Sequence, residues 1–311
     1  MPLSPNPYAA LKEASQFVRL WRGKTFLIKV GGEVIAEPKM RKALCEQIAL
    51  LWSFSIRVVL VHGGGPELDA VCRAMDIPIQ KVAGRRVTTP EVLDAAKMVF
   101  AGQVHMDLLA ELLANGVPAV GLSGVDAGLV KASRRPPVSV VPDGATEPVL
   151  VDFGLVGDID SVDPSVLTHL LEGGFVPVVA PLSGGTDGAI YNTNADTIAA
   201  SLASALAAEK IFFLLSVPGL LKDVNKSSSL IPHATLEELA VLEKEGVISG
   251  GMRPKLTAVR NALASGVASA HLVSGLAPDA LLAEVFTNEG SGTMIIPTPI
   301  AVSYTHLRAQ D

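Results

Sequence analysis

Short runs of apolar residues alternate along the chain with longer segments in which apolar residues recur every three or four positions. The short runs are typical of β-strands, and the periodic segments are typical of amphipathic helices. The run at residues 211–215, Ile-Phe-Phe-Leu-Leu, is apolar at every position, which indicates a strand buried on both faces. The predicted strands cover residues 25–30, 57–61, 117–122, 176–180, 211–215 and 269–273.

The predicted helices lie between these strands, so strand and helix alternate through most of the chain. This alternation predicts an α/β protein with a mainly parallel sheet and helices on both faces. The predicted helices cover residues 38–53, 66–75, 90–115, 164–173, 195–208, 235–245, 254–266 and 278–287.

Two internal segments interrupt the alternation. Within residues 127–160, short apolar runs at 138–141 and 149–151 flank the turn sequence Pro-Asp-Gly at 142–144. This pattern predicts an antiparallel hairpin that extends over the edge of a site. Residues 222–232 are rich in serine, asparagine and lysine, which indicates an exposed loop.

The two ends of the chain also depart from the alternation. Residues 7–22 place apolar side chains on one face of a helix that precedes the first strand. Such a helix either packs on its own domain or forms an arm that packs on another subunit, and the pattern leaves both open. We interpret residues 299–311 as a tail that is disordered or non-native.

The composition excludes several classes of protein. The 311 residues are 49% apolar and carry a net charge of −6, which does not fit the basic surface of a nucleic-acid-binding protein. Cys45 and Cys72 lie in helical patterns without metal-site spacing, which predicts reduced core thiols. No signal peptide is visible, and the longest apolar stretch, residues 211–221, is too short to span a bilayer. We therefore expect a cytoplasmic protein with neither a membrane nor nucleic acid as partner.

Glycine clusters follow the first two predicted strands. The first cluster, Gly31-Gly32, comes just after Lys29, and the second, at residues 63–65, lies between His62 and a proline. Either cluster alone is also compatible with a tight strand-to-helix turn. Because parallel strands carry both turns to one sheet edge, where backbone N–H groups can bind an anion, the pair indicates phosphate chemistry. A lysine buried at the end of a strand also needs an anionic partner.

A polar cluster precedes the helix predicted at 195–208. Asn194 is expected to cap this helix, which places Asp196 in its first turn. The helix dipole alone favours an acid there. Asp196 could also face the cleft that contains Lys29, and Asn192 could donate a hydrogen bond to a carboxylate.

Three further features bear on chemistry. Lys255 lies in the first turn of a helix, where a lysine is unfavourable unless an anion binds beside it. Arg85 and Arg86 form a pair that is commonly solvated in loops, although one guanidinium could hold a substrate carboxylate through two hydrogen bonds. The strand at 211–215 ends in a Pro-Gly turn suited to line a nucleotide pocket. We interpret His62 as structural, because no serine or cysteine nucleophile accompanies it.

Taken in order, these motifs resemble the amino acid kinase family and, within it, the acetylglutamate kinases. The resemblance runs from about Lys24 to Ile296, which is nearly the whole chain. It is carried by Lys29-Val30-Gly31-Gly32, His62-Gly63-Gly64-Gly65-Pro66, Arg86-Val87-Thr88, Gly121-Leu122-Ser123-Gly124, Asn192-Thr193-Asn194-Ala195-Asp196-Thr197, Val217-Pro218-Gly219, Gly250-Gly251-Met252 with Lys255, and Gly292-Thr293-Met294.

The resemblance implies a three-layer αβα sandwich of the carbamate kinase type, with a mainly parallel central sheet and two lobes. Residues 1–23 would form a helical arm. Residues 24–182 would bind N-acetyl-L-glutamate, and residues 183–298 would bind ATP with Mg²⁺. The reaction would transfer a phosphoryl group from ATP to the side-chain carboxylate, as a step of arginine biosynthesis. Mg²⁺ would be bound through ATP, with no protein side chain as a ligand.

The resemblance also implies roles for single residues. Lys29 and Lys255 would stabilise the transferring phosphoryl group, and Asp196 would orient both lysines. Gly64 and Gly65 would offer N–H groups to the reacting end of the substrate. The other implied contacts are Arg86 and Asn192 with the α-carboxylate, and Gly31, Gly32, Ser216, Val217, Pro218, Gly219, Leu220, Leu221, Ser249 and Gly250 with the nucleotide.

The N-terminal arm resembles that of arginine-inhibited members, in which it interlaces dimers into a hexamer. His271, Glu284 and Gly290 fall where those members line an arginine site. The resemblance therefore implies a homodimer or hexamer and L-arginine as an inhibitor. The sequence departs from the family pattern at Ser216, which stands in place of an acid, at Glu33, in place of asparagine, and at Leu276, in place of a basic residue.

Three other functions stay open at this point. A kinase of the same fold could act on a related carboxylate such as carrier-bound aminoadipate, although Gly65-Pro66 and residues 192–196 favour acetylglutamate. A non-catalytic amino-acid sensor could keep the fold, but Lys29, Asp196 and Lys255 are all present. A nicotinamide-dependent oxidoreductase would need spaced glycines and an acid that the chain lacks.

Overall fold

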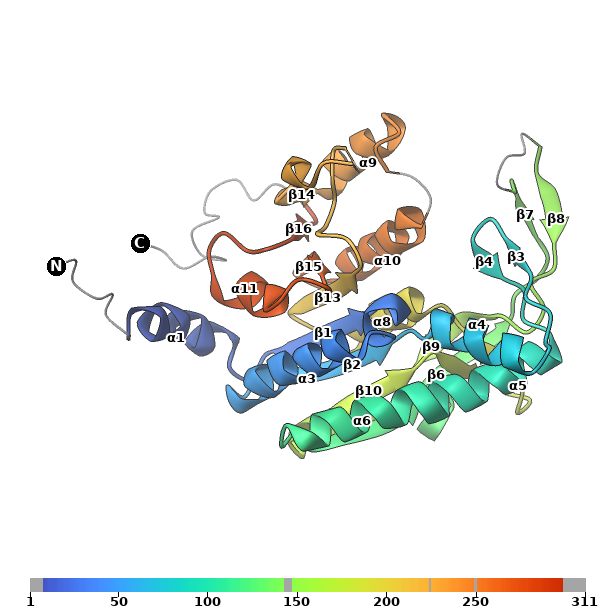
Figure 1. Ribbon diagram of the computed structural model, residues 1–311, viewed down its shortest axis with the longest axis horizontal. Coiled ribbons are helices and arrows are strands. Elements are labelled where there is room, and N and C mark those ends of the chain that lie inside the picture. The colour runs from blue at the N-terminus through green and yellow to red at the C-terminus, as the bar shows by residue number, and fades with distance from the viewer. Residues whose placement is uncertain (1–7, 143–146, 224, 249–250, 299–311) are drawn as a thin grey trace.

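The computed structural model describes residues 8–142, 147–223, 225–248 and 251–298, and within them an eight-stranded sheet forms the centre of the molecule (Figure 1). The strand order is β14-β16-β15-β13-β1-β2-β10-β5, and all neighbours are parallel except β15 and β16. All six strands expected from the apolar runs belong to this sheet, whereas β14 and β16 were not predicted. The strands are β1 Thr25–Val30, β2 Arg57–His62, β5 Ala119–Ser123, β10 Val176–Ala180, β13 Lys210–Leu215, β14 His233–Thr235, β15 Ser269–Ser274 and β16 Thr293–Ile296.

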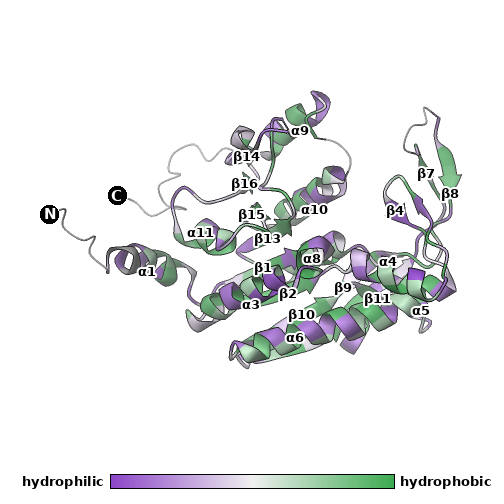
Figure 2. Ribbon diagram, viewed as in Figure 1, coloured by the Kyte–Doolittle hydropathy of each residue, from purple (hydrophilic) through white to green (hydrophobic). Residues whose placement is uncertain are grey.

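Helices cover both faces of the sheet, and each face has its own apolar core, so the three-layer prediction is confirmed. Figure 2 shows green and purple residues on the same helices, as expected when one side packs on the sheet and the other faces water. One face carries α1 Ala9–Trp21, α2 Gly32–Ile35, α3 Pro38–Ser53, α4 Gly65–Ala74, α5 Pro90–Met98, α6 Val104–Ala114 and α11 Ala280–Phe286, and the other carries α7 Ser165–Glu172, α8 Ala195–Ala205, α9 Leu236–Lys244 and α10 Met252–Ala264.

The central strand β1 directs alternate side chains to the two faces. Phe26, Ile28 and Val30 join the core beneath α3, while Leu27 joins the core beneath α8 and α10. Because side chains alternate along a strand, Lys29 lies on the same face as Leu27. The position of Lys29 next to α8 therefore follows from the period of the strand.

A second, four-stranded sheet continues from the carboxyl ends of β5 and β10. Its order is β12-β11-β6-β9. These strands were not predicted, because they are short or carry polar residues on both faces. They are β6 Val130–Arg134, β9 Gly157–Val162, β11 Leu182–Gly184 and β12 Ile190–Asn192.

Two antiparallel hairpins project beyond the same end of the molecule, opposite α1 (Figure 1). One consists of β3 Lys81–Val82 and β4 Arg85–Arg86, and the other of β7 Val138–Val140 and β8 Val149–Val151. The second is the hairpin predicted from the interruption of the strand–helix alternation. Part of its turn lies outside the described residues. Residues from both hairpins line a common hollow of about 570 Å³.

The helix predicted at 90–115 forms as α5 and α6, which a π-helical segment at Val99–Gln103 joins. Cys45 and Cys72 are buried free thiols on α3 and α4. Burial raises the pKa of Cys45 to about 12, so this thiol is unreactive at neutral pH.

The last turns of α1 pack on the chain's own domain. Phe17 and Trp21 are buried in the core that they share with α11. The indole Nε1 of Trp21 donates to the carbonyl of Val285, at 3.3 Å. For these turns, the interpretation that the helix packs on its own domain is thus confirmed. Contact of the helix with another subunit stays a prediction. The tail at 299–311 lies outside the described residues. Within the part of the chain that is described, no helix is long and apolar enough to cross a membrane.

Candidate active site

The two predicted glycine turns touch each other at the carboxyl edge of the main sheet. The N–H of Gly63 donates to the carbonyl of Val30, which joins the end of β2 to the end of β1. A Cβ built on Gly32 would lie 2.7 Å from Pro66 Cδ, which is closer than two non-bonded carbon atoms can approach. Absence of a side chain at Gly32 is therefore a packing requirement of the paired turns.

The paired turns bring two backbone nitrogens beside one small space. A Cβ on Gly32 would lie 2.9 Å from the nitrogen of Gly65 and 3.0 Å from that of Gly64, so both nitrogens border one small space. Neither nitrogen donates a hydrogen bond to another described residue, as is normal for the first turn of a helix. Two free N–H groups at the start of α4 are suited to bind an oxyanion.

Lys29 and Asp196 form a buried ion pair beside these turns. The Nζ of Lys29 lies 2.6 Å from Oδ1 of Asp196, and each side chain is 7% exposed. Removal of both charges from water is costly unless they pair. The requirement that a buried lysine have an anionic partner is thus met by Asp196, and these two predicted catalytic residues are brought together.

The start of α8 holds Asp196 in this place. Asn194 caps the helix as predicted, because its Oδ1 accepts from the N–H groups of Asp196 and Thr197 at 2.9 and 3.0 Å. This cap fixes the first turn, in which Asp196 faces the sheet. The helix continues with Ile198 and Ala199 in the core beneath β1.

Arg86 lies on the other side of the glycine turns. Its Nη2 pairs with Oδ1 of Asp69 at 2.5 Å and lies 3.4 Å from the carbonyl of Gly65. Lys81 contacts the second oxygen of Asp69, at 2.7 Å. Burial raises the pKa of Asp69, but the hydrogen bonds from Lys81 and Arg86 outweigh burial and hold it below its ordinary value. Asp69 stays charged and fixes the Arg86 guanidinium above the start of α4.

Asn192 joins the same region through Thr88. The Nδ2 of Asn192 donates to Oγ1 of Thr88, at 3.1 Å, and Thr88 follows Arg86 by two residues. Thr88 itself is buried and bridges to Gly154. The structure therefore gathers Arg86 and Asn192, the two predicted α-carboxylate ligands, on segments that contact each other.

The predicted nucleotide-binding residues lie on the opposite side of β1. The turn at 216–221 follows β13, which pairs directly with β1. Ser216 and Val217 are exposed, whereas Gly219 and Leu220 are buried. The N–H of Leu220 donates to Oγ1 of Thr293, so this part of the turn is tied to β16. Gly31 borders this side of β1, because its N–H donates to the carbonyl of Leu214, whereas Gly32 touches the turn after β2. Ser249 and Gly250 lie outside the described residues.

Lys255 lies in the first turn of α10, which packs against α8. Its Nζ donates to the carbonyl of Gly251 at the start of the same helix, at 3.2 Å. The helix begins at Met252, two residues earlier than predicted. The side chain is partly exposed, so it can turn toward a ligand without breaking a buried contact.

His271 and Glu284, predicted for an arginine site, form a buried pair near α1. The Nδ1 of His271 lies 2.6 Å from Oε1 of Glu284, while Oε2 of Glu284 accepts from the N–H groups of Ser291 and Gly292. The ring of His271 also contacts Lys210, whose ammonium lies 4.5 Å from the ring centre of Trp21. Gly290 lies on the adjoining loop and is partly exposed.

This pair gives a prediction about acid stability. Burial raises the pKa of Glu284, but hydrogen bonds and charge from His271, with two backbone N–H groups, lower it from 4.5 to about 2. A depressed pKa stabilises the fold above the unfolded value, and that stabilisation is lost as pH falls from about 4.5 to about 2. The Glu284→Gln variant should be about 3 kcal/mol less stable at neutral pH, and urea unfolding should show this gap closing across that window. The exposed Glu289→Gln variant is the control, and an equal pH dependence in all three proteins would contradict the assignment.

Sequence reasoning missed Asp69, Thr88 and His105 at this site. Asp69 lies one turn after the second glycine cluster, and a carboxylate at that spacing was the available signal. Thr88 belongs to a quoted motif, but nothing in the sequence connects its hydroxyl to Asn192. His105 contacts His62 from α6, 43 residues away, and no local pattern points to this contact.

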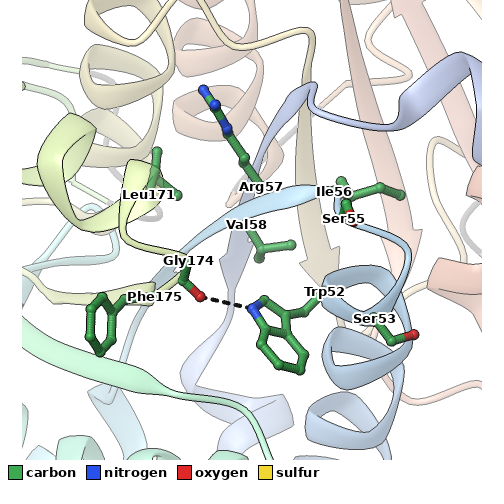
Figure 3. Close-up of a pocket in the computed structure, with 9 residues that line it drawn as sticks. All are labelled: Trp52, Ser53, Ser55, Ile56, Arg57, Val58, Leu171, Gly174 and Phe175. Carbon is green, nitrogen blue, oxygen red and sulfur yellow. Dashed lines mark hydrogen bonds between the residues drawn. The ribbon is translucent and has the colours of Figure 1, made fainter.

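A separate hollow of about 370 Å³ lies at the opposite edge of the main sheet (Figure 3). In it, the indole Nε1 of Trp52 donates to the carbonyl of Gly174 at 2.9 Å. Arg57 is the charged residue among those that line it, and no acid or histidine is present in the lining. The glycine turns with the Lys29–Asp196 pair, which combine N–H donors and a buried ion pair, are therefore the stronger candidate site.

Comparison with known proteins identifies the family of the chain. A profile of the amino acid kinase family matches residues 24–274. The chain is 64% identical to acetylglutamate kinase from Myxococcus xanthus, over 95% of this chain and 96% of that one. It is 41% identical to acetylglutamate kinase from Symbiobacterium thermophilum, over 93% and 97% of the two chains.

Solved structures show the same fold. N-acetylglutamate synthase from Neisseria gonorrhoeae, complexed with coenzyme A and N-acetyl-glutamate, aligns with a TM-score of 0.80 at 28% identity, over 97% of this chain and 67% of that one. Carbamate kinase from Giardia lamblia aligns with a TM-score of 0.62 at 20% identity, over 89% and 99% of the chains. Together with the sequence matches, these findings place the chain in the amino acid kinase family and, within it, among the acetylglutamate kinases.

Proposed function

We propose that the protein transfers the terminal phosphoryl group of ATP to the side-chain carboxylate of N-acetyl-L-glutamate, a step of arginine biosynthesis. The observation that carries the proposal is the Lys29–Asp196 pair beside two touching glycine turns. The name shared by relatives at 64% and 41% identity supports the choice of acceptor. The product would be an acyl phosphate, N-acetyl-L-glutamyl 5-phosphate.

The acceptor needs no general base, because a carboxylate is already a nucleophile at neutral pH. Catalysis then consists of alignment and of neutralising charge on the transferring group. The N–H groups of Gly64 and Gly65 would bind the reacting carboxylate, and the ammonium of Lys29 would bind the transferring phosphoryl oxygens. Donors fixed in a site with little water stabilise developing charge more strongly than water can.

Asp196 would act by holding Lys29 in position between donor and acceptor. A lysine has four rotatable bonds, and pairing at 2.6 Å restricts where its ammonium lies. Lys255 lies in the first turn of the helix packed on α8 and would turn from Gly251 to the phosphates when nucleotide is bound. The turn at 216–221 would contact the nucleotide.

Mg²⁺ fits this arrangement as a partner of the nucleotide. It prefers oxygen ligands, retains water and is commonly bound through phosphates. Within the described residues no group of three or more His, Cys, Asp or Glu side chains is placed to hold a metal. We propose that Mg²⁺ enters with ATP and neutralises phosphate charge, because it is commonly bound through phosphates, while the lysines act on the transferring group.

Arg86 would bind the α-carboxylate of the acceptor together with Asn192. Replacement by lysine keeps the charge but removes the planar fork, so the parallel pair of N–H groups that can bind a carboxylate beside the contact with Asp69 is lost. We expect Arg86→Lys to raise KM for N-acetylglutamate about tenfold or more while kcat changes little. The neighbouring exposed Arg85→Lys variant is the matched control, and equal KM values in the two variants would exclude Arg86 from acceptor binding.

The decisive experiment measures ADP release from Mg²⁺–ATP with N-acetylglutamate as acceptor. Turnover that depends on this acceptor supports the proposal. A preference for carrier-bound aminoadipate would instead indicate a related kinase of the same fold. Absence of ADP with every acceptor, in protein that still binds an amino acid, would indicate a sensor.

We further propose that L-arginine inhibits the enzyme and that the N-terminal helix joins subunits into a dimer or hexamer. N-acetylglutamate synthase from Neisseria gonorrhoeae, which is 25% identical, has a structure complexed with L-arginine. In this chain His271 and Glu284 are fully engaged with each other and with neighbouring groups, so an arginine site would adjoin this pair at Gly290. Titration of activity with arginine tests the first proposal, and light scattering before and after deletion of residues 1–20 tests the second.

A further inference from the structure

Two buried histidines lie directly behind the second glycine turn. His62 ends β2 and is fully buried, and His105 lies on α6 and is 6% exposed. The Nδ1 of His62 is 2.7 Å from the carbonyl oxygen of Gly63, and its Nε2 is 3.0 Å from Nδ1 of His105. These contacts form a chain from α6 to the peptide bond that joins Gly63 to Gly64.

The positions of the protons on this chain follow from its chemistry. A carbonyl only accepts, so Nδ1 of His62 carries the hydrogen. Burial lowers the pKa of His62 to about 3, so its ring is neutral near pH 7 and Nε2 is an acceptor. Nδ1 of His105 must then donate. Burial also lowers the pKa of His105, and its Nε2 faces Gly121, where a Cβ would overlap it.

The orientation of one peptide plane follows from these bonds. No cis peptide bond occurs among the described residues, and in a trans peptide the C=O and the next N–H point in opposite directions. The bond from His62 to the Gly63 carbonyl therefore directs the Gly64 N–H away from the histidines. A Cβ built on Gly32 would lie 3.0 Å from the Gly64 nitrogen, so the space beside Gly32 is within reach of this nitrogen.

We propose that His62 and His105 are positioning residues that hold the Gly63–Gly64 peptide so that the Gly64 N–H faces the acceptor carboxylate. Three consecutive glycines have unusual conformational freedom, and this peptide would otherwise rotate. The inference rests on the proposed function for the identity of the bound oxyanion. The peptide orientation itself does not depend on that identity.

Matched substitutions at His105 separate positioning from packing. In His105→Asn the amide nitrogen can replace Nδ1 as donor to His62, whereas His105→Leu fills similar space without a donor. We expect His105→Leu to lower kcat about tenfold with little change in KM for ATP. The asparagine variant should stay within about twofold of the unchanged protein. Leu112→Ala, buried at the far end of α6, should lower stability without lowering kcat.

A second pair tests the other end of the chain of bonds. His62→Asn can still donate to the Gly63 carbonyl, whereas His62→Leu cannot. We expect the asparagine variant to retain more kcat than the leucine variant. Equal kcat in both members of either pair, or a loss that matches the folded fraction measured by urea unfolding, would overturn the proposal.

The unchanged protein provides a test that needs no substitution to fold. Nitrogen chemical shifts of ¹⁵N-histidine-labelled protein should show both rings neutral and protonated at Nδ1, opposite to the tautomer preferred by free histidine. Protonation of either ring at Nε2 would overturn the proposal. This measurement does not involve turnover. Failure of the unchanged protein to phosphorylate N-acetylglutamate would therefore refute the proposed function and leave the peptide orientation to be judged from the shifts.

Discussion

Replacement of Lys29 with methionine is expected to lower kcat about a thousandfold, because the ammonium that we propose neutralises the transferring phosphoryl group would be lost. Methionine keeps the length and most of the volume of the side chain, so the core beneath α8 should stay filled. The measurement is ADP release with N-acetylglutamate under saturating substrates. Turnover near that of the unchanged protein would remove Lys29 from the mechanism.

A stability measurement on the same variant distinguishes lost chemistry from lost structure. Lys29→Met leaves Asp196 charged and 7% exposed without its partner, which should cost about 3–5 kcal/mol. The double variant with Asp196→Asn leaves neither charge unpaired and should recover most of this loss in urea unfolding. Its kcat should stay as low as that of the single variant. Recovery of activity together with stability would mean that Lys29 acts only in folding.

Replacement of Gly32 with alanine is expected to lower kcat/KM at least about a hundredfold. The added methyl would lie 2.7 Å from Pro66 Cδ and within 3.0 Å of the nitrogens of Gly64 and Gly65. These neighbours are backbone or a ring fixed to it, so the two turns would have to separate. Displacement of a donor from a transition-state oxyanion has an effect of this size. Steady-state kinetics with both substrates measures the loss.

The control for this substitution is Gly102→Ala. A Cβ on Gly102 would have nothing within 4 Å, and its helical backbone accepts alanine without strain. This variant should be as active as the unchanged protein and slightly more stable, because alanine restricts the unfolded chain. Equal activity of the two alanine variants would show that the contact between the turns is not required.

The sequence predicted the main sheet well for a physical reason. Central parallel strands are apolar on both faces, so runs such as residues 211–215 can be recognised as buried strands from the local sequence alone. The strands of the second sheet, such as β9 with the sequence Gly-Asp-Ile-Asp-Ser-Val, carry polar residues on both faces. They are stabilised by partners distant in the chain, and β14 and β16 are too short to give a pattern. These elements depend on tertiary contacts, which leave no periodic pattern of apolar residues in the local sequence.

Prediction of the site had the same limit. The glycine turns and Lys29 could be assigned to one sheet edge because strand direction fixes where parallel strands end. The cap at Asn194, and with it the place of Asp196, followed from local helix chemistry. The partners of Arg86 and of His62 could not be derived, because Asp69 and His105 reach them through the packing of α4 and α6 on other elements. Local rules place single side chains, and tertiary packing decides their neighbours.

The order of the three neighbouring strands β13, β1 and β2 has a consequence for catalysis. The turn proposed to bind the nucleotide follows β13, the lysine proposed to bind the phosphoryl group lies on β1, and the turn proposed to bind the acceptor follows β2. Adjacent strands are about 4.8 Å apart. The hydrogen bonds between the three strands therefore fix the spacing of the donor, the migrating group and the recipient. In the proposed mechanism the in-line arrangement would follow from the strand pairing, and loops at the rim could change the acceptor without changing that axis.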